Sequence, residues 1–145
     1  MQVKIKKLTS RAIIPTKGSS DAAGMDLYAL LDEPVTINPN ETYLIKTGLS
    51  YEIPSGYVGL IFARSGLATK EGLAPSNKVG VIDADYRGEI MVSLYNQSNT
   101  PRVINDGQRI AQMVIMPILD VELVVDHNLS DTDRGEGGFG STGKK

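Results

Sequence analysis

The sequence predicts an all-β domain of the sandwich or barrel type, and three observations support this fold class. Short apolar runs recur at close spacing and are separated by Gly, Pro and Asn. Within residues 89–95, apolar and polar side chains alternate with the period of two that is typical of a half-buried strand. Only residues 65–71 have a helical pattern. We expect strands at residues 35–37, 43–47, 49–53, 57–63, 89–96, 109–116 and 121–125.

Each predicted element is bounded by residues that end strands or helices. The runs are interrupted by Asn, Pro and Gly at 38–40, 54–56 and 99–101 and by Asp-Gly at 106–107. The helix has Ser65 at its start, where the hydroxyl would cap it, and Gly72 after its end. The last long run is apolar, and its residues either pack against other subunits or fill the core of the single chain. These residues are Met113, Ile115 and Met116.

Composition excludes several classes of function. A chain of 145 residues is long enough for one domain, expected at residues 1–133 and followed by a mobile arm at 134–145. With no cysteine and one histidine, His127, thiolate chemistry and multi-histidine zinc sites are excluded. A net charge of −2 without basic blocks argues against nucleic-acid binding. No apolar run is long enough for a membrane span and no signal peptide is present, so we expect a cytoplasmic (or virus-encoded intracellular) protein.

The C-terminal run 134–143 is half glycine and carries Arg134, Phe139, Ser141 and Thr142. A guanidinium and hydroxyls suit phosphates, and an aromatic ring suits a flat base. Extended backbone separates Arg134 from Phe139 by at most ~17 Å. One interpretation is an arm that closes over a nucleotide. The alternative is a frayed terminus.

Residues 80–90 place a polar link between two strand-like runs and predict a hairpin. Asp83 directly follows an apolar run, where partial desolvation favours a general base. For Asp83 and Asp85 the alternative is ordinary turn chemistry, and we assign that structural role to Asp85. Tyr86 is either a platform for a sugar or a residue with high strand propensity.

Three further segments contain candidate ligand-binding residues. Arg64, Ser65 and Gly66 stand at the junction of a strand and the short helix, where a phosphate would bind. A plain helix cap at Ser65 is equally compatible with this pattern. Asp26 and Gln112 lie within strand-like runs, and alone each is more typical of a structural hydrogen-bonding residue.

Taken together, five segments resemble the motifs of the trimeric dUTPase family, in the same order along the chain. They are AGMDLYA at 23–29, ARSGLA at 63–68, GVIDADYRGEI at 80–90, GQRIAQM at 107–113 and RGEGGFGSTG at 134–143. The resemblance implies a jelly-roll-like β-barrel homotrimer whose three active sites are each built from all three chains. It also implies hydrolysis of dUTP to dUMP and pyrophosphate, which limits uracil in DNA and supplies dUMP.

The same resemblance implies a role for each motif residue. Asp83 would activate the water that attacks the α-phosphorus, and Tyr86 would pack against deoxyribose. Asp26 would hold a hydrated Mg²⁺ through water. The uracil-reading residues would be Val81, Ile82 and Met91, with Asn77 acting through water; phosphates would be held by Arg64, Ser65, Gly66 and Gln112; the tail would contribute Arg134, Phe139, Gly140, Ser141 and Thr142.

One residue departs from the family pattern, and two other functions compete with this interpretation. Ala63 replaces the proline usual in the family, which removes a backbone restraint but no proposed contact. A dCTP deaminase shares the fold but requires acid–base groups at the base ring, typically glutamate. A noncatalytic nucleotide sensor is the other alternative. The spacing of Asp83 and Tyr86 favours dUTPase.

Overall fold

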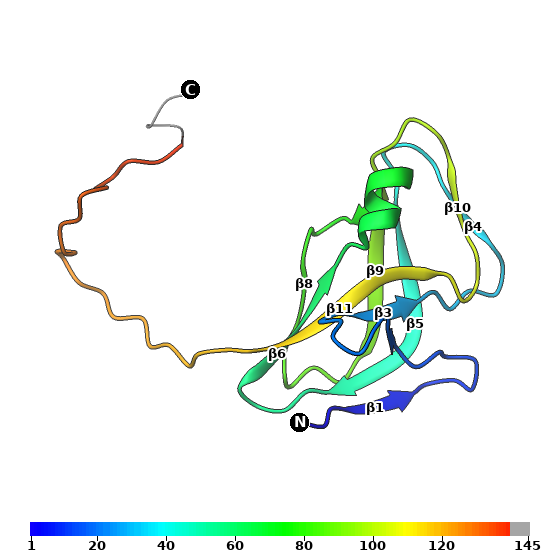
Figure 1. The fold of residues 1–145 in the computed structure, drawn as a ribbon, viewed down its shortest axis with the longest axis horizontal. Helices are drawn as coiled ribbons and strands as arrows, with labels where there is room; N and C mark the ends of the chain where they lie inside the picture. Colours follow the sequence, from blue (N-terminus) through cyan, green and yellow to red (C-terminus); the bar gives the residue numbers. More distant parts are fainter. Residues whose placement is uncertain (140–145) are drawn as a thin grey trace.

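The computed structural model describes residues 1–139, and its strands confirm the predicted all-β class. Within residues 1–139 all strand pairs are antiparallel, and they form two main sheets and a two-stranded ribbon (Figure 1). The first sheet has the order β1 (Lys4–Lys7), β5 (Thr42–Glu52), β9 (Glu89–Asn96), β7 (Leu73–Pro75). The second has the order β2 (Thr16–Lys17), β3 (Met25–Tyr28), β11 (Arg109–Pro117), β6 (Tyr57–Phe62), β8 (Gly80–Ile82), and the ribbon pairs β10 (Arg102–Ile104) with β4 (Val35–Ile37).

Side chains from both main sheets meet in one buried cluster. On β9, Ile90, Val92 and Leu94 are at most 2% exposed whereas Met91 is 37% exposed, which confirms the predicted alternation. Met113 is fully buried in this core, so it fills the core of the single chain and does not pack against another subunit. The strands of residues 1–139 remain in three separate sheets, and the barrel implied by the resemblance is not formed as a closed ring of paired strands.

The strands predicted at 43–47 and 49–53 are one strand, β5, with an irregularity at Gly48. Gly48 has a φ of +69° and lies where the register with β9 shifts, between Lys46 and Ser50. Its N–H donates to Glu89 Oε1 at 2.8 Å, and Thr47 Oγ1 donates to the Ile90 carbonyl at 2.7 Å. The two predicted strands are therefore one continuous strand with a bulge at the position where the sequence predicted a break.

The predicted helix forms, although Ser65 does not cap it. Ser65 already lies inside the helical turn, because the Ala68 N–H donates to the Arg64 carbonyl at 2.9 Å. The turn continues as the π-helical segment η1 (Leu67–Glu71), which has no side-chain cap. Gly72 ends it with a φ of +71°, as predicted. Among residues 1–139, no helix is both long and apolar enough to cross a membrane.

The hairpin predicted at 80–90 is wrong. β8 pairs with β6, where Ile82 lies opposite Gly59, whereas β9 pairs with β5, where Glu89 lies opposite Ser50. Residues 83–88 therefore cross from one sheet to the other. Local sequence shows two strands and a turn but does not show which strands they pair with.

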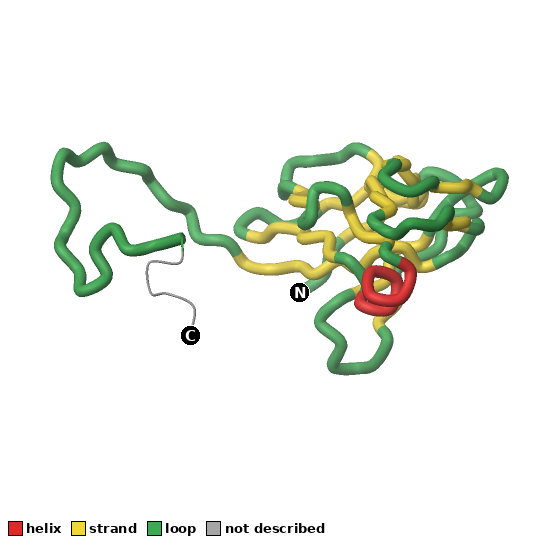
Figure 2. Tube along the Cα trace, turned by 90° about the horizontal axis from the view of Figure 1, so that it is seen from above, coloured by secondary structure: helices red, strands yellow, loops and turns green. Residues whose placement is uncertain are grey.

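The strand predicted at 121–125 is also wrong, because this segment has no pairing partner among the described residues. The Ile118 N–H donates to the Gly56 carbonyl at 2.9 Å, and beyond it the chain leads away from the domain (Figure 2). Its apolar side chains are exposed, including Leu123 at 93% and Val125 at 94%. We call residues 118–139 the extended arm.

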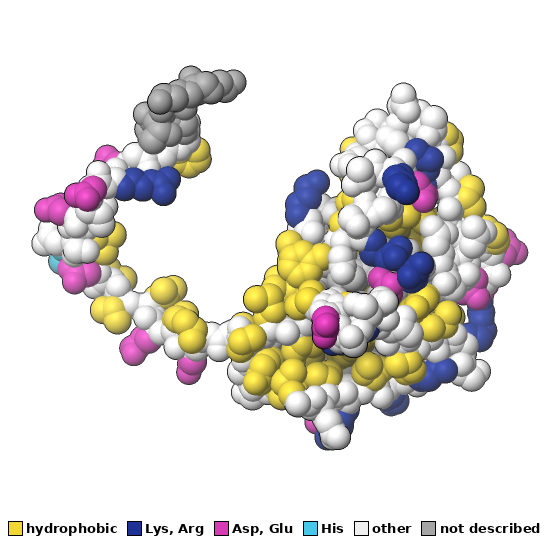
Figure 3. All heavy atoms as spheres, in the orientation of Figure 1, with side chains coloured by type: hydrophobic (Ala, Val, Ile, Leu, Met, Phe, Trp, Pro, Cys, Tyr) yellow, Lys and Arg dark blue, Asp and Glu magenta, His cyan; other side chains and the backbone are white. Residues whose placement is uncertain are grey.

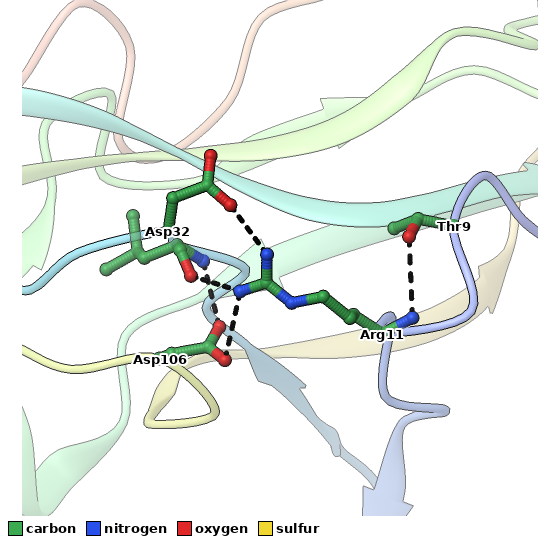
Figure 4. Close-up of polar contacts among 5 residues, drawn as sticks. Thr9, Arg11, Asp32 and Asp106 are labelled. Carbon is green, nitrogen blue, oxygen red and sulfur yellow. Dashed lines mark hydrogen bonds and ion pairs between the residues drawn. The ribbon is translucent and has the colours of Figure 1, made fainter.

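A polar cluster ties three loops together and was not predicted from the sequence (Figure 4). The Arg11 guanidinium donates to Asp32 Oδ1 at 2.6 Å, to Asp106 Oδ2 at 3.2 Å and to the Leu31 carbonyl. Asp106 Oδ1 accepts the Leu31 N–H at 2.9 Å, and the Arg11 N–H donates to Thr9 Oγ1. The Leu31 N–H is the main cause that lowers the pKa of Asp106, and Arg11 adds to it.

This cluster predicts a pH-dependent contribution to stability. Because folding lowers the pKa of Asp106, its contribution is present above the unfolded pKa near ~4 and is lost as the pH falls through the folded pKa. We expect Asp106→Ala to lower the melting temperature at pH 7, with the difference from wild type shrinking between pH 5 and pH 2.

Asp32→Ala is the matched control, because the Asp32 side chain is 93% exposed and accepts only from Arg11. It should change the melting temperature much less at pH 7. Equal losses in the two variants, or a loss in Asp106→Ala that is independent of pH, would contradict the assignment.

Candidate active site

Most of the predicted phosphate-binding residues line one hollow of about 230 Å³, which we call the basic hollow. Among residues 1–139 its lining contains two arginines and one carboxylate, and Figure 3 shows basic side chains gathered between the helix and β3. The hollow brings together residues from three of the five motif segments, namely 23–29, 63–68 and 107–113. The lining residues are Gly18, Ala22, Gly24, Asp26, Arg64, Ser65, Gly66, Arg109 and Gln112.

Strand register brings these residues together. On β11, Gln112 lies opposite Asp26 of β3 on one side and opposite Phe62 of β6 on the other. Arg64 lies two residues beyond the end of β6, and its Nε donates to Asp26 Oδ1 at 2.7 Å. Arg109 Nη1 donates to Asp26 Oδ2 at 3.1 Å. Asp26 is therefore an ion-paired anchor whose side chain is only 13% exposed. Neither ion pair was predicted from the sequence, and Arg109 was not among the predicted site residues.

The Gln112 amide is oriented by a hydrogen bond at Nε2 and occupies the space that Gly24 leaves at Oε1. Its Nε2 donates to the Ala63 carbonyl at 2.9 Å, so a backbone group of the residue that replaces the family proline orients it. Its Oε1 lies 2.3 Å from where a Cβ of Gly24 would be. Only glycine at position 24 leaves the Gln112 amide in this place. This steric limit explains why the motif has glycine at that position.

A second hollow of about 230 Å³ lies at the crossing from β8 to β9, and we call it the loop hollow. The Tyr86 N–H donates to the Asp83 carbonyl at 3.2 Å, and Tyr86 Oη donates to the Glu89 carbonyl at 3.0 Å. Asp83 is exposed because the crossing runs over the surface, so its predicted desolvation is absent in the single chain. The lining residues are Leu44, Val81, Ile82, Asp83, Tyr86, Glu89 and Met91.

The residues that line the loop hollow differ in part from those predicted from the sequence. Leu44 and Glu89 line the loop hollow but were not predicted, because Leu44 reaches it only through the pairing of β5 with β9. Asn77 is exposed and outside the lining, although its side chain approaches Gly80. Val81 is 60% exposed and lies on β8, the last strand of its sheet.

The two hollows share no lining residue and lie toward opposite ends of β6. Ile82 lies opposite Gly59, so the next residue, Asp83, lies toward Val58 near the start of β6. Arg64 lies beyond the other end of β6. At ~3.3 Å per residue, the Asp83 backbone and the Arg64 backbone are separated by roughly 20 Å. One chain therefore does not place its Asp83 beside its own basic hollow.

Of the predicted tail residues the structure describes Arg134 and Phe139, and neither joins a hollow of the single chain. Arg134 Nε donates to the Gly137 carbonyl at 2.8 Å, and Phe139 is fully exposed. Neither residue is among the linings of the two hollows. The predicted sites Gly140, Ser141 and Thr142 lie outside the described residues.

The side chains of the basic hollow can bind a divalent cation only if the bound ligand and water supply most of the coordinating atoms. Within residues 1–139, no group of three or more His, Asp or Glu side chains converges. Asp26 is the one carboxylate of the basic hollow, and both its oxygens accept from arginines. Mg²⁺ usually keeps several waters and is bound through one or two carboxylates plus substrate phosphates, which matches such a sparse set.

Comparison with known proteins agrees with this geometry, since residues 10–143 match the family model described as dUTPase. The chain belongs to the dUTPase family. A family relative from Nautilia profundicola, named deoxyuridine 5'-triphosphate nucleotidohydrolase, is 51% identical over 99% of this chain and 100% of its own. A relative of the same name from a Hydrogenobaculum species is 49% identical over the full length of both.

Solved dUTPase structures have the same fold. A mutant of the dUTPase of Staphylococcus bacteriophage 80alpha, solved with dUpNHpp, has a TM-score of 0.89 and 31% identity over 99% of both chains. A mutant of the dUTPase of phage phi11 of S. aureus, described for the coordination of a structural Mg(II) ion, has a TM-score of 0.81 and 27% identity. That comparison covers 90% of this chain and 100% of the phage chain.

The ion pairs of Asp26 predict that this carboxylate stabilises the fold as well as the site. Asp26→Asn leaves two guanidiniums without their counter-charge, and we expect the free energy of unfolding to fall by about 1–3 kcal/mol. Urea denaturation at fixed protein concentration measures it. The control is Glu52→Gln, which breaks the exposed Lys4–Glu52 pair at 2.8 Å and should change little. Similar losses in both variants would contradict the anchoring role.

Proposed function

We propose that this chain is a dUTP diphosphatase, which hydrolyses dUTP to dUMP and pyrophosphate in the cytoplasm. The observation that carries the proposal is the pair of hollows, one basic and one lined by a β-edge, a tyrosine and a carboxylate. The dUTP analogue dUpNHpp in the phage relative supports the substrate. The reaction would limit uracil in DNA and supply dUMP for thymidylate synthesis.

The basic hollow is suited to the triphosphate. Arg64, Ser65, Gly66 and Gln112 present a guanidinium, a hydroxyl, a backbone amide and a side-chain amide to phosphate oxygens. Asp26 restrains Arg64 at 2.7 Å, so little conformational entropy is lost when a phosphate binds. Bound together with the triphosphate, Mg²⁺ neutralises phosphate charge, and Asp26 would contact its hydration shell.

The loop hollow is suited to the deoxynucleoside. β8 is the edge of its sheet, so backbone groups of Val81 and Ile82, with Met91 opposite, are available to read uracil, and Asn77 would act through water. A base with the wrong donor pattern would leave buried polar groups unpaired, which can give ~10⁴-fold rejection. The Tyr86 ring, at 41% exposure, presents a surface for deoxyribose that leaves no room for a 2′-hydroxyl.

Catalysis would consist of one activated water and a neutralised phosphate chain. The Asp83 carboxylate accepts a proton from the water as its oxygen bonds to the α-phosphorus. The bond between the α-phosphorus and the bridging oxygen to the β-phosphorus breaks, and pyrophosphate leaves. Phosphoryl transfer requires mainly positioning and charge stabilisation, so no histidine is needed.

The roughly 20 Å between Asp83 and Arg64 favours a site shared between subunits. We propose a homotrimer in which one subunit supplies the basic hollow, a second supplies the loop hollow and a third supplies the tail. Exposed apolar side chains along the extended arm, such as Leu119 at 85%, need a partner surface that the single chain lacks. In the tail, Phe139 would stack on the base; the groups closing on the γ-phosphate would be Arg134, Gly140, Ser141 and Thr142.

The rival deaminase needs a free acid–base group near the base. Glu89 is the one glutamate lining the loop hollow, and its Oε1 already accepts the Gly48 N–H at 2.8 Å. Its engagement with the β5 bulge gives it a structural role. This contact favours hydrolysis at phosphorus over deamination.

The decisive experiment is pyrophosphate release from dUTP, dCTP, UTP and dTTP by the wild type and by Asp83→Asn. We expect release from dUTP above all others. Asp83→Asn should keep dUTP binding and lower kcat by ~10²–10⁴-fold, because a general base is lost. Ammonia from dCTP would identify a deaminase, and dUTP binding without turnover would identify a sensor. Near-normal turnover by Asp83→Asn would assign water activation to another group.

Deletion of the tail tests whether it contributes to catalysis without contributing to the stability of the trimer. Removing residues 134–145 should leave a trimer with an unchanged melting temperature, because Arg134 and Phe139 contact neither hollow in the chain. It should sharply lower kcat/KM, since closure positions the triphosphate and excludes water. Light scattering and steady-state kinetics measure the two effects. A truncated enzyme with normal kinetics, or one that loses the trimer, would refute this division of roles.

A further inference from the structure

Gly88 lies directly beneath the phenol ring of Tyr86. A Cβ built on Gly88 would be 2.3 Å from Tyr86 Oη, 2.5 Å from Cζ and 2.9 Å from Cε2. A Cβ atom essentially never lies this close to a non-bonded heavy atom, so any larger residue at 88 must displace either the ring or the backbone. The missing side chain of Gly88 therefore makes room for Tyr86.

Glycine is not needed at position 88 for its backbone conformation. The glycines with positive φ among residues 1–139 are Gly48, Gly56, Gly72, Gly107 and Gly135. Gly88 is outside that group, so its backbone is available to alanine. What glycine supplies here is space.

The ring is also held from its polar end. Tyr86 Oη donates to the Glu89 carbonyl at 3.0 Å, which folds the side chain back over the start of β9. Glu89 is itself fixed to β5, because its Oε1 accepts the Gly48 N–H at 2.8 Å. The ring position is thus defined by a hydrogen bond at Oη and by the space over Gly88.

The backbone around the ring is fixed by other contacts. Ser50 Oγ donates to the Arg87 carbonyl at 2.6 Å, which ties the loop to β5. Arg87 Nη1 donates to the Ala84 carbonyl at 2.6 Å and to the Tyr86 carbonyl at 3.0 Å. A clash at position 88 is therefore relieved most easily by rotation of the exposed Tyr86 side chain, while the loop stays in place.

We propose that Gly88 is a positioning residue for sugar selection: its missing Cβ lets the Tyr86 ring form the wall that rejects a ribonucleotide. The inference rests on the proposed function, because it assumes that Tyr86 faces the deoxyribose of dUTP. A residue with a Cβ at position 88 turns the ring away and opens space for a 2′-hydroxyl. The preference for dUTP over UTP then depends on Gly88 and Tyr86 together.

The experiment is a double-mutant cycle on Gly88→Ala and Tyr86→Ala, with kcat/KM measured for dUTP and UTP. Each single variant should narrow the dUTP:UTP preference by ~10-fold or more. The double variant should narrow it no further than Tyr86→Ala alone, because the atoms that clash with a Cβ at 88 are gone. Additive effects would show that Gly88 acts through something other than Tyr86 and would overturn the proposal.

Two further measurements separate this inference from folding defects and from the proposed function. If Gly88→Ala is unstable, the double variant should restore the melting temperature of Tyr86→Ala, and a failure to do so overturns the proposal. A crystal structure of Gly88→Ala should show the Tyr86 Oη moved away from the Glu89 carbonyl, whatever the turnover. A ring that stays in place refutes the role of Gly88, whereas a wild type without dUTP hydrolysis refutes the proposed function.

Discussion

The central position of β11 in its sheet is the constraint on which the basic hollow depends. Because β11 pairs with β3 on one side and β6 on the other, Gln112 is level with Asp26 and with the end of β6 that precedes Arg64. The ion pair of Asp26 with Arg64 then follows from register, whereas that with Arg109 also involves the shift of register between Arg109 and Ala111. A shift of one residue in either pairing would move these side chains to opposite faces and disperse the site.

Two glycines leave space for side chains that line the two hollows. Gly24 makes room for the Gln112 amide, and Gly88 makes room for the Tyr86 ring, with virtual Cβ contacts of 2.3 Å in both cases. In each case the side chain is also fixed by a hydrogen bond to a backbone carbonyl, that of Ala63 or of Glu89. Preorganisation of this kind lowers the entropy lost when a ligand binds.

The single chain buries one core but leaves the apolar side chains of its extended arm exposed. Leu27, Ile45 and Ile110 are fully buried between the sheets, whereas Leu123 and Val125 are more than 90% exposed. The arm makes no strand pairing within residues 1–139. The apolar side chains of this segment therefore lie outside the core of the chain.

The sequence by itself determined features that depend on near neighbours in the chain. Alternation along β9 and the end of the helix at Gly72 are local properties, and the structure confirms them. The tertiary structure alone decided that 80–90 crosses between sheets, that Asp83 is exposed and that Arg109 pairs with Asp26. A strand's pattern specifies which of its faces is buried, but its partner is chosen by long-range packing, which leaves no periodic signal in the sequence.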